Sequence, residues 1–212
     1  MSSPEQACRA ARLISEAMRP ERGGSPSYRA YHVIEALRLA SRAPVGRPYL
    51  SRRLGLGETP AKTLIGRLER LGLLKRTPKG RHATPSALEI LAALQKVVHV
   101  YPARLGLFNS EGEILAIIEV LDPPEDLTGV YQLRDYLVAR GCRVSIIGGI
   151  HRGGSVSLPG VPEELASKVV DFVGGLGGVN RGVIIAVPSP CIHPLYDAII
   201  DMILDSCTVR RE

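Results

Sequence analysis

The chain has 212 residues, with 27 Lys+Arg against 21 Asp+Glu and a formal net charge of +6. Hydrophobic residues make up 45% and charged residues 23%, which excludes a chain that is disordered throughout. We find no uncharged apolar run of about 18 residues or more, as a transmembrane helix needs, and no apolar signal-peptide core near the start. We therefore expect a cytoplasmic protein with no membrane partner.

Basic and acidic residues are distributed unequally along the chain. Residues 1–100 carry 18 Lys+Arg and 7 Asp+Glu, a net charge of +11, whereas residues 101–212 carry 9 and 14, a net charge of −5. This asymmetry predicts two domains with different partners, and nucleic acid is the usual partner of a basic domain. The alternative is an Arg-rich surface that contacts only solvent.

The basic half shows the 3.6-residue periodicity of helices in several segments. Residues 19–27 are polar and rich in Gly and Pro, and they separate a first helix, residues 4–18, from the rest. Thr59 and Pro60 fit the cap and first position of a helix that ends before Gly72. The expected order is then a helix over 31–41, a short helix over 48–54, a helix over 59–71, a hairpin over 73–83 and a helix over 84–98.

This order resembles the winged helix-turn-helix domain of prokaryotic and archaeal transcription regulators. Residues 49–56 (YLSRRLGL), the helix over 59–71 and residues 79–81 (KGR) of the hairpin carry the resemblance. It covers residues 28–98, under half of the chain, and it implies a DNA-binding domain there. Residues 1–27 would form a preceding helix and linker.

The resemblance also implies where DNA would be contacted. The helix over 59–71 would enter the major groove, where an Arg can pair with guanine and a Thr can contact a thymine methyl group. Gly66 would either let DNA approach closely or let a neighbouring helix pack tightly. The expected DNA-binding residues lie on the second helix, the third helix and the hairpin: Arg52, Arg53, Lys62, Thr63, Arg67, Arg70, Arg76, Lys79 and Arg81.

The acidic half alternates strands and helices. Apolar runs at 114–121 and 183–187 predict buried strands. The expected elements between them give the order β-α-β-β-α-β, which is ferredoxin-like and resembles ligand-sensing domains such as ACT in element order only. The fold class is thus α+β, with a second domain over 104–208 that ends in an extra helix. The alternative is a three-layer α/β sheet that includes a strand over 104–109 and this final helix.

Candidate effector-binding residues of the acidic half lie in loops. Three of them follow the strand at 114–121, and ligands gather at the carboxyl ends of strands. Two more lie in the Gly-rich segment 148–154, which could form an anion-binding nest of backbone amides or a plain hairpin turn. The residues are Asp122, Glu125, Asp126, His151 and Arg152.

Cysteine and histidine offer a second kind of site. Cys191 and His193 could both ligate a soft metal ion, with Cys142, His151 or Asp197 completing the site. The alternative is that they only pack or cap a helix. The four cysteines are widely spaced, with no CxxC pair, and predict no disulfide framework.

These patterns favour a sequence-specific transcription regulator that binds double-stranded DNA as a homodimer, because palindromic sites need two copies. The helices over 4–18 and 85–98 are the candidate dimer contacts. The second domain would sense a small-molecule or metal effector, or dimerise. An enzyme with an accessory winged helix remains an alternative, although we see no paired acid, base or nucleophile, and so does a protein-interaction scaffold.

Overall fold

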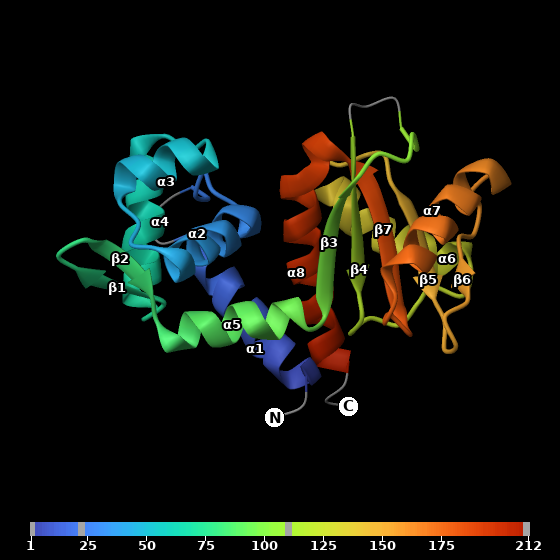
Figure 1. The fold of residues 1–212 in the computed structure, drawn as a ribbon, viewed down its shortest axis with the longest axis horizontal. Helices are drawn as coiled ribbons and strands as arrows, with labels where there is room; N and C mark the ends of the chain where they lie inside the picture. Colours follow the sequence, from blue (N-terminus) through green and yellow to red (C-terminus); the bar gives the residue numbers. More distant parts are fainter. Residues whose placement is uncertain (1–2, 21–23, 109–111, 210–212) are drawn as a thin grey trace. The chain divides into compact units, whose positions relative to one another are not determined.

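The computed structural model describes residues 3–20, 24–108 and 112–209. It consists of two compact units, Met1–Lys96 and Val97–Glu212 (Figure 1). Within the described ranges, no helix is both long enough and apolar enough to span a membrane.

The N-terminal unit contains helices and a hairpin in the order expected from the sequence. Pro48 lies in the first turn of the short helix α3 (Arg47–Leu54), which ends where Gly55 adopts a left-handed conformation with φ of 64°. The Thr84 side chain caps the last helix by accepting a hydrogen bond from the Ala87 amide. The elements are α1 (Ser3–Met18), α2 (Ala30–Arg42), α3 (Arg47–Leu54), α4 (Glu58–Arg70), β1 (Leu74–Thr77), β2 (Gly80–Ala83) and α5 (Pro85–Gln95).

Helix α1 belongs to this unit rather than to a separate arm. Its buried face consists of Ala7, Ala10, Ala11, Ile14 and Ala17, each at most 1% exposed. Because four of these five side chains are those of alanine, α5 and α2 can pack closely against α1. The basic half therefore has an aliphatic core that includes the first helix.

The C-terminal unit is built on one antiparallel sheet with strand order β3-β4-β7-β5-β6. A short 3₁₀ helix, Ser189–Cys191, precedes the last helix. The elements are β3 (Val98–Ala103), β4 (Glu113–Ile118), α6 (Leu127–Ala139), β5 (Ile146–Ile150), β6 (Val156–Ser157), α7 (Glu163–Leu176), β7 (Gly182–Pro188) and α8 (Ile192–Val209).

The order β-α-β-β-α-β runs from β4 to β7 as expected, but the sheet is not ferredoxin-like. Its last strand, β7, lies between β4 and β5, whereas a ferredoxin-like sheet has its last strand at an edge. The first strand also lies at 98–103 instead of 104–109. The reason is that the amides of Leu105 and Leu107 bond to the Glu113 carboxylate and not to another strand.

Helices cover both faces of this sheet, which gives three layers (Figure 1). On one face, Leu115 of β4 and Ile184 of β7 join a buried cluster with Val169 and Val173 of α7. The alternate side chains of the strands point to the other face, which α6 and α8 cover. The three-layer alternative from the sequence thus describes the layers better.

Candidate functional site

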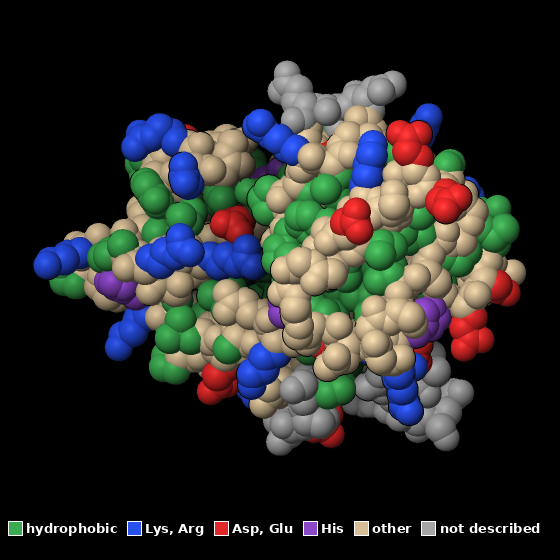
Figure 2. Space-filling model, turned by 45° about the vertical axis from the view of Figure 1, so that its right-hand side comes forward, with side chains coloured by type: hydrophobic (Ala, Val, Ile, Leu, Met, Phe, Trp, Pro, Cys, Tyr) green, Lys and Arg blue, Asp and Glu red, His purple; other side chains and the backbone are tan. Residues whose placement is uncertain are grey.

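Three consecutive elements of the N-terminal unit carry exposed cations. They are the last turn of α3, the outer face of α4 and the β1–β2 hairpin. Figure 2 shows Lys and Arg side chains in blue over this unit, at the left of the view. Of the residues expected to bind DNA, those exposed are Arg52, Arg53, Lys62, Thr63, Arg70, Arg76 and Lys79.

The acidic residues of α4 are neutralised by other cations. Glu58 pairs with Arg47 at 3.4 Å, and Glu69 Oε1 pairs with Arg81 Nε at 3.0 Å. Within the part of the chain that the structure describes, none of Arg52, Arg53, Lys62, Lys75, Arg76 and Lys79 makes an ion pair. These six charges therefore give α3, α4 and the hairpin an uncompensated positive potential.

Arg67 does not face outward as the sequence analysis expected. It is only 6% exposed, and its Nη1 donates a hydrogen bond to the Ala17 carbonyl of α1 at 3.0 Å. The buried residues of α4 are Ala61, Leu64, Ile65, Arg67 and Leu68, so position 67 belongs to the inward face of the helix. The sequence gives no direct indication that α1 packs on this side of α4.

Small side chains occupy the centre of the exposed face of α4. Thr63 is exposed, and its hydroxyl donates to the Thr59 carbonyl at 3.1 Å. Among the described residues, a Cβ atom at Gly66 would meet only Arg70 Nη1, at 3.8 Å, so no described helix packs tightly against this position. An adjoining hollow of about 510 Å³ is lined by Arg47, Pro48, Lys62, Gly66 and Arg81, among others.

Arg81 connects the hairpin to the rest of the unit. Its backbone amide and carbonyl both pair with Val45 at 2.9 Å, and its guanidinium contacts Glu69 of α4. The side chain is half-buried. Arg81 thus holds the hairpin against α4.

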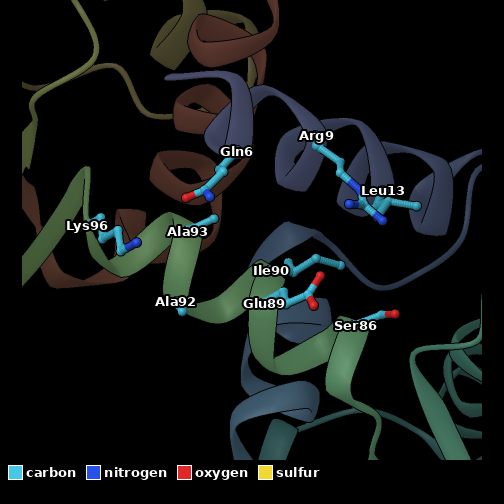
Figure 3. Close-up of a pocket in the computed structure, with 9 residues that line it drawn as sticks. All are labelled: Gln6, Arg9, Leu13, Ser86, Glu89, Ile90, Ala92, Ala93 and Lys96. Atoms are coloured by element: carbon cyan, nitrogen blue, oxygen red, sulfur yellow. The ribbon is translucent and has the colours of Figure 1, made fainter. Parts of the chain in front are cut away.

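The two helices expected to contact a second copy pack against each other within the unit. A shallow pocket of about 380 Å³ lies between α1 and α5, and Figure 3 shows Arg9 and Leu13 on one side with Glu89 and Ile90 on the other.

The C-terminal unit brings most of the expected effector residues together. Asp122, Glu125, His151 and Arg152 line one open pocket of about 420 Å³, together with Pro123 and Arg181. Sequence reasoning missed Arg181 because no motif marks it. The pairing of β7 with β4 would have indicated it, since the residue before β7 then lies beside those that follow β4.

Asp126 is separate from this group. Its side chain caps α6 by accepting a hydrogen bond from the Gly129 amide at 2.9 Å. Its role in the structure is therefore to start a helix, and it does not line the pocket.

The expected metal site is not supported. Cys191 forms a disulfide with Cys142, with Cα atoms 5.5 Å apart, so it offers no thiolate beside His193. Within the described ranges, no group of three or more His, Cys, Asp or Glu residues could hold a metal ion. The expectation of no disulfide was wrong because α6 and α8 pack side by side, which brings the end of α6 to the start of α8.

Known proteins identify the fold but not the activity. No known protein family and no curated protein matches the sequence. Among solved structures, the chain is similar to "Hypothetical protein PH0730 from Pyrococcus horikoshii OT3", at 21% identity and a TM-score of 0.54. The match covers 85% of this chain and 94% of the other. The two proteins therefore share a mixed α+β fold across both units.

Proposed function

We propose that the protein is a DNA-binding transcription regulator of the winged helix-turn-helix type. In this proposal α3 and α4 form the helix-turn-helix, and the β1–β2 hairpin forms the wing. The observation that carries it is the set of six exposed cations on these elements, none of which forms an ion pair among the residues that the structure describes. Phosphate contacts by such cations provide most of the affinity of a protein for DNA.

In our proposal the cations have different tasks. Helix α4 enters the major groove with Lys62, Thr63 and Arg70, and Gly66 lets the backbone of α4 approach the base edges. Arg52 and Arg53 of α3 and Arg76 and Lys79 of the hairpin contact phosphates. Arg67 and Arg81 support this surface from within, because they fix α4 to α1 and the hairpin to α4.

The rest of the chain regulates this activity in our proposal. A single winged helix buries little surface on DNA, so the protein acts as a homodimer on a palindromic site. The C-terminal unit, with its open pocket of acidic and basic side chains, binds a small effector molecule.

Fluorescence anisotropy with a labelled random duplex of roughly 30 base pairs, over a series of NaCl concentrations, tests the DNA proposal. The wild-type chain should bind, and the logarithm of its binding constant should fall linearly with the logarithm of the salt concentration. In the triple variant R53A/R76A/K79A, which removes three proposed phosphate contacts, the slope should decrease by about 2 to 3, because each phosphate contact contributes about 0.9.

The matched control is the triple variant R104A/R143A/K168A, which removes three cations of the C-terminal unit. It should bind DNA with the wild-type affinity and slope. A wild-type chain that does not bind, or binds without salt dependence, would reject the proposal. Equal losses in the two triple variants would show that general positive charge, and not this surface, attracts DNA.

A further inference from the structure

We propose that the pocket lined by Asp122, Glu125, His151, Arg152 and Arg181 binds a small molecule that carries both an ammonium group and a carboxylate. This inference rests on the proposed effector-binding role of the C-terminal unit and makes that role specific. It does not depend on DNA binding by the N-terminal unit, so the two proposals can fail separately.

The sheet brings three separate segments to one edge. Strands β4 and β5 both run antiparallel to β7, so the ends of β4 and β5 and the beginning of β7 meet there. Gly182 has φ of 152°, and a Cβ atom on it would lie 2.7 Å from the Ile118 carbonyl oxygen. Only glycine allows β7 to begin this close to the end of β4. Arg181 consequently lies beside Asp122, with Nη2 and Oδ1 2.5 Å apart.

A second glycine fixes the acidic loop onto β5. A Cβ atom at Gly149 would lie 2.2 Å from Pro123 Cβ, so the loop can rest on the strand only because position 149 has no side chain. The two consecutive prolines, Pro123 and Pro124, restrict the loop further. The carboxylates on either side of them, Asp122 and Glu125, are thus held at defined positions next to the β5–β6 turn.

The β5–β6 turn is ordered by its own hydrogen bonds. The His151 amide donates to the Ser155 carbonyl at 2.8 Å, and the Gly154 amide donates to the His151 carbonyl at 3.0 Å. The His151 ring also bonds to the Ser157 hydroxyl through Nε2, at 2.7 Å. Arg152 therefore lies in a hydrogen-bonded turn, and a site that is ordered before binding loses less entropy when a ligand binds.

The charges in the pocket select a ligand with both signs. Asp122 and Arg181 neutralise each other. Among the described residues, Glu125 and Arg152 form no ion pair, and both are exposed at this pocket. A purely anionic ligand would meet the two carboxylates, and a purely cationic one would meet the two guanidinium groups. A carboxylate on Arg152 and an ammonium group on Glu125 satisfy both free charges.

Isothermal titration calorimetry on the full chain without DNA tests this inference. The probes are glycine, β-alanine, 4-aminobutyrate and 6-aminohexanoate, which separate the two charges by increasing lengths. Butylamine and butyrate are the singly charged controls. At least one of the four amino acids should bind, and neither control should bind comparably.

Two variants then locate the binding. Arg152→Ala and Glu125→Gln should each weaken the bound amino acid by roughly tenfold or more, because each removes one charge-assisted hydrogen bond. The matched controls Arg143→Ala and Glu163→Gln, exposed residues outside the pocket, should keep the wild-type affinity. The inference is overturned if none of the four amino acids binds, if butyrate or butylamine binds as tightly, or if neither pocket variant weakens binding. DNA anisotropy on the same protein keeps this result separate from the DNA proposal.

Discussion

The guanidinium group of Arg67 in α4 donates a hydrogen bond from Nη1 to the main-chain oxygen of Ala17 in α1, at 3.0 Å and 50 residues apart in sequence. The Tyr28 hydroxyl donates to the same oxygen, also at 3.0 Å. Ala17 lies in the last turn of α1, where carbonyl groups lack helical partners and the helix dipole favours a cation. Arg67 thus fixes the end of α1 to α4.

Arg67→Ala should therefore lower stability rather than DNA specificity. Loss of a buried, charge-assisted hydrogen bond should reduce the free energy of unfolding by about 1.5–3 kcal/mol, measured by urea unfolding followed by circular dichroism. Lys62→Ala, at an exposed position on the same helix, should change it by less than about 0.5 kcal/mol. A wild-type unfolding curve for the Arg67 variant would show that the bond to Ala17 contributes nothing.

Gly66→Ala should have opposite effects on stability and on DNA affinity. The new methyl group has room, since the nearest atom would be 3.8 Å away, and alanine favours a helix over glycine by about 0.5–1 kcal/mol. The same methyl group would stand on the face proposed to approach DNA, so DNA affinity should fall. Gly174→Ala on α7, which also has open space around it, should stabilise similarly without changing DNA affinity. Unchanged affinity in the Gly66 variant would place the DNA contact elsewhere.

The periodic patterns predicted most elements of both units, because helical and strand periods arise from local burial. Helix α4 and the β1–β2 hairpin lie within a few residues of their predicted bounds. What the sequence could not provide was long-range pairing. Arg67 was misplaced because its partner lies in α1, and the sheet order was wrong because periodicity does not say which strands are neighbours. Four effector candidates meet in one pocket, and Arg181 joins them only through the β4–β7 pairing.

Glu113→Gln should destabilise the C-terminal unit. The Glu113 side chain is buried, at 2% exposure, and its two oxygens accept hydrogen bonds from the Leu105 and Leu107 amides at 2.9 and 3.0 Å. A glutamine has only one acceptor oxygen, so one buried amide would lose its partner, at a cost of about 1–3 kcal/mol. Urea unfolding should show this loss, whereas the exposed Glu163→Gln should unfold like the wild type. Equal stability of the two variants would contradict this role for Glu113.

The Cys142–Cys191 disulfide should contribute strongly to stability. It closes a loop of 49 residues, which restricts the unfolded chain. For a loop of this length the double variant C142A/C191A should lose about 2–4 kcal/mol of unfolding free energy relative to the oxidised wild type. Both proteins should be compared in urea without reductant, so that only this bond differs. A loss well below 1 kcal/mol would indicate that the unfolded state is already compact around these residues.

Tyr136 should make the C-terminal unit less stable at high pH. Its hydroxyl donates a hydrogen bond to the Asp205 carboxylate, and this bond, with burial and the charges of Asp205 and Asp201, raises the pKa of Tyr136 from 10.0 to about 12. Because the folded pKa lies above the unfolded one, the stabilisation is complete below pH 10 and is lost as pH rises towards 12.

Two measurements check this prediction. In an absorbance titration of the tyrosines, Tyr136→Phe should lose a late-ionising phenol that the wild type has, while Tyr131→Phe, an exposed position on the same helix, should retain it. Urea unfolding over the same pH range should show a decline in stability that is smaller in Tyr136→Phe. If the decline is equal in the two proteins, other groups cause the loss of stability at high pH and the bond to Asp205 does not.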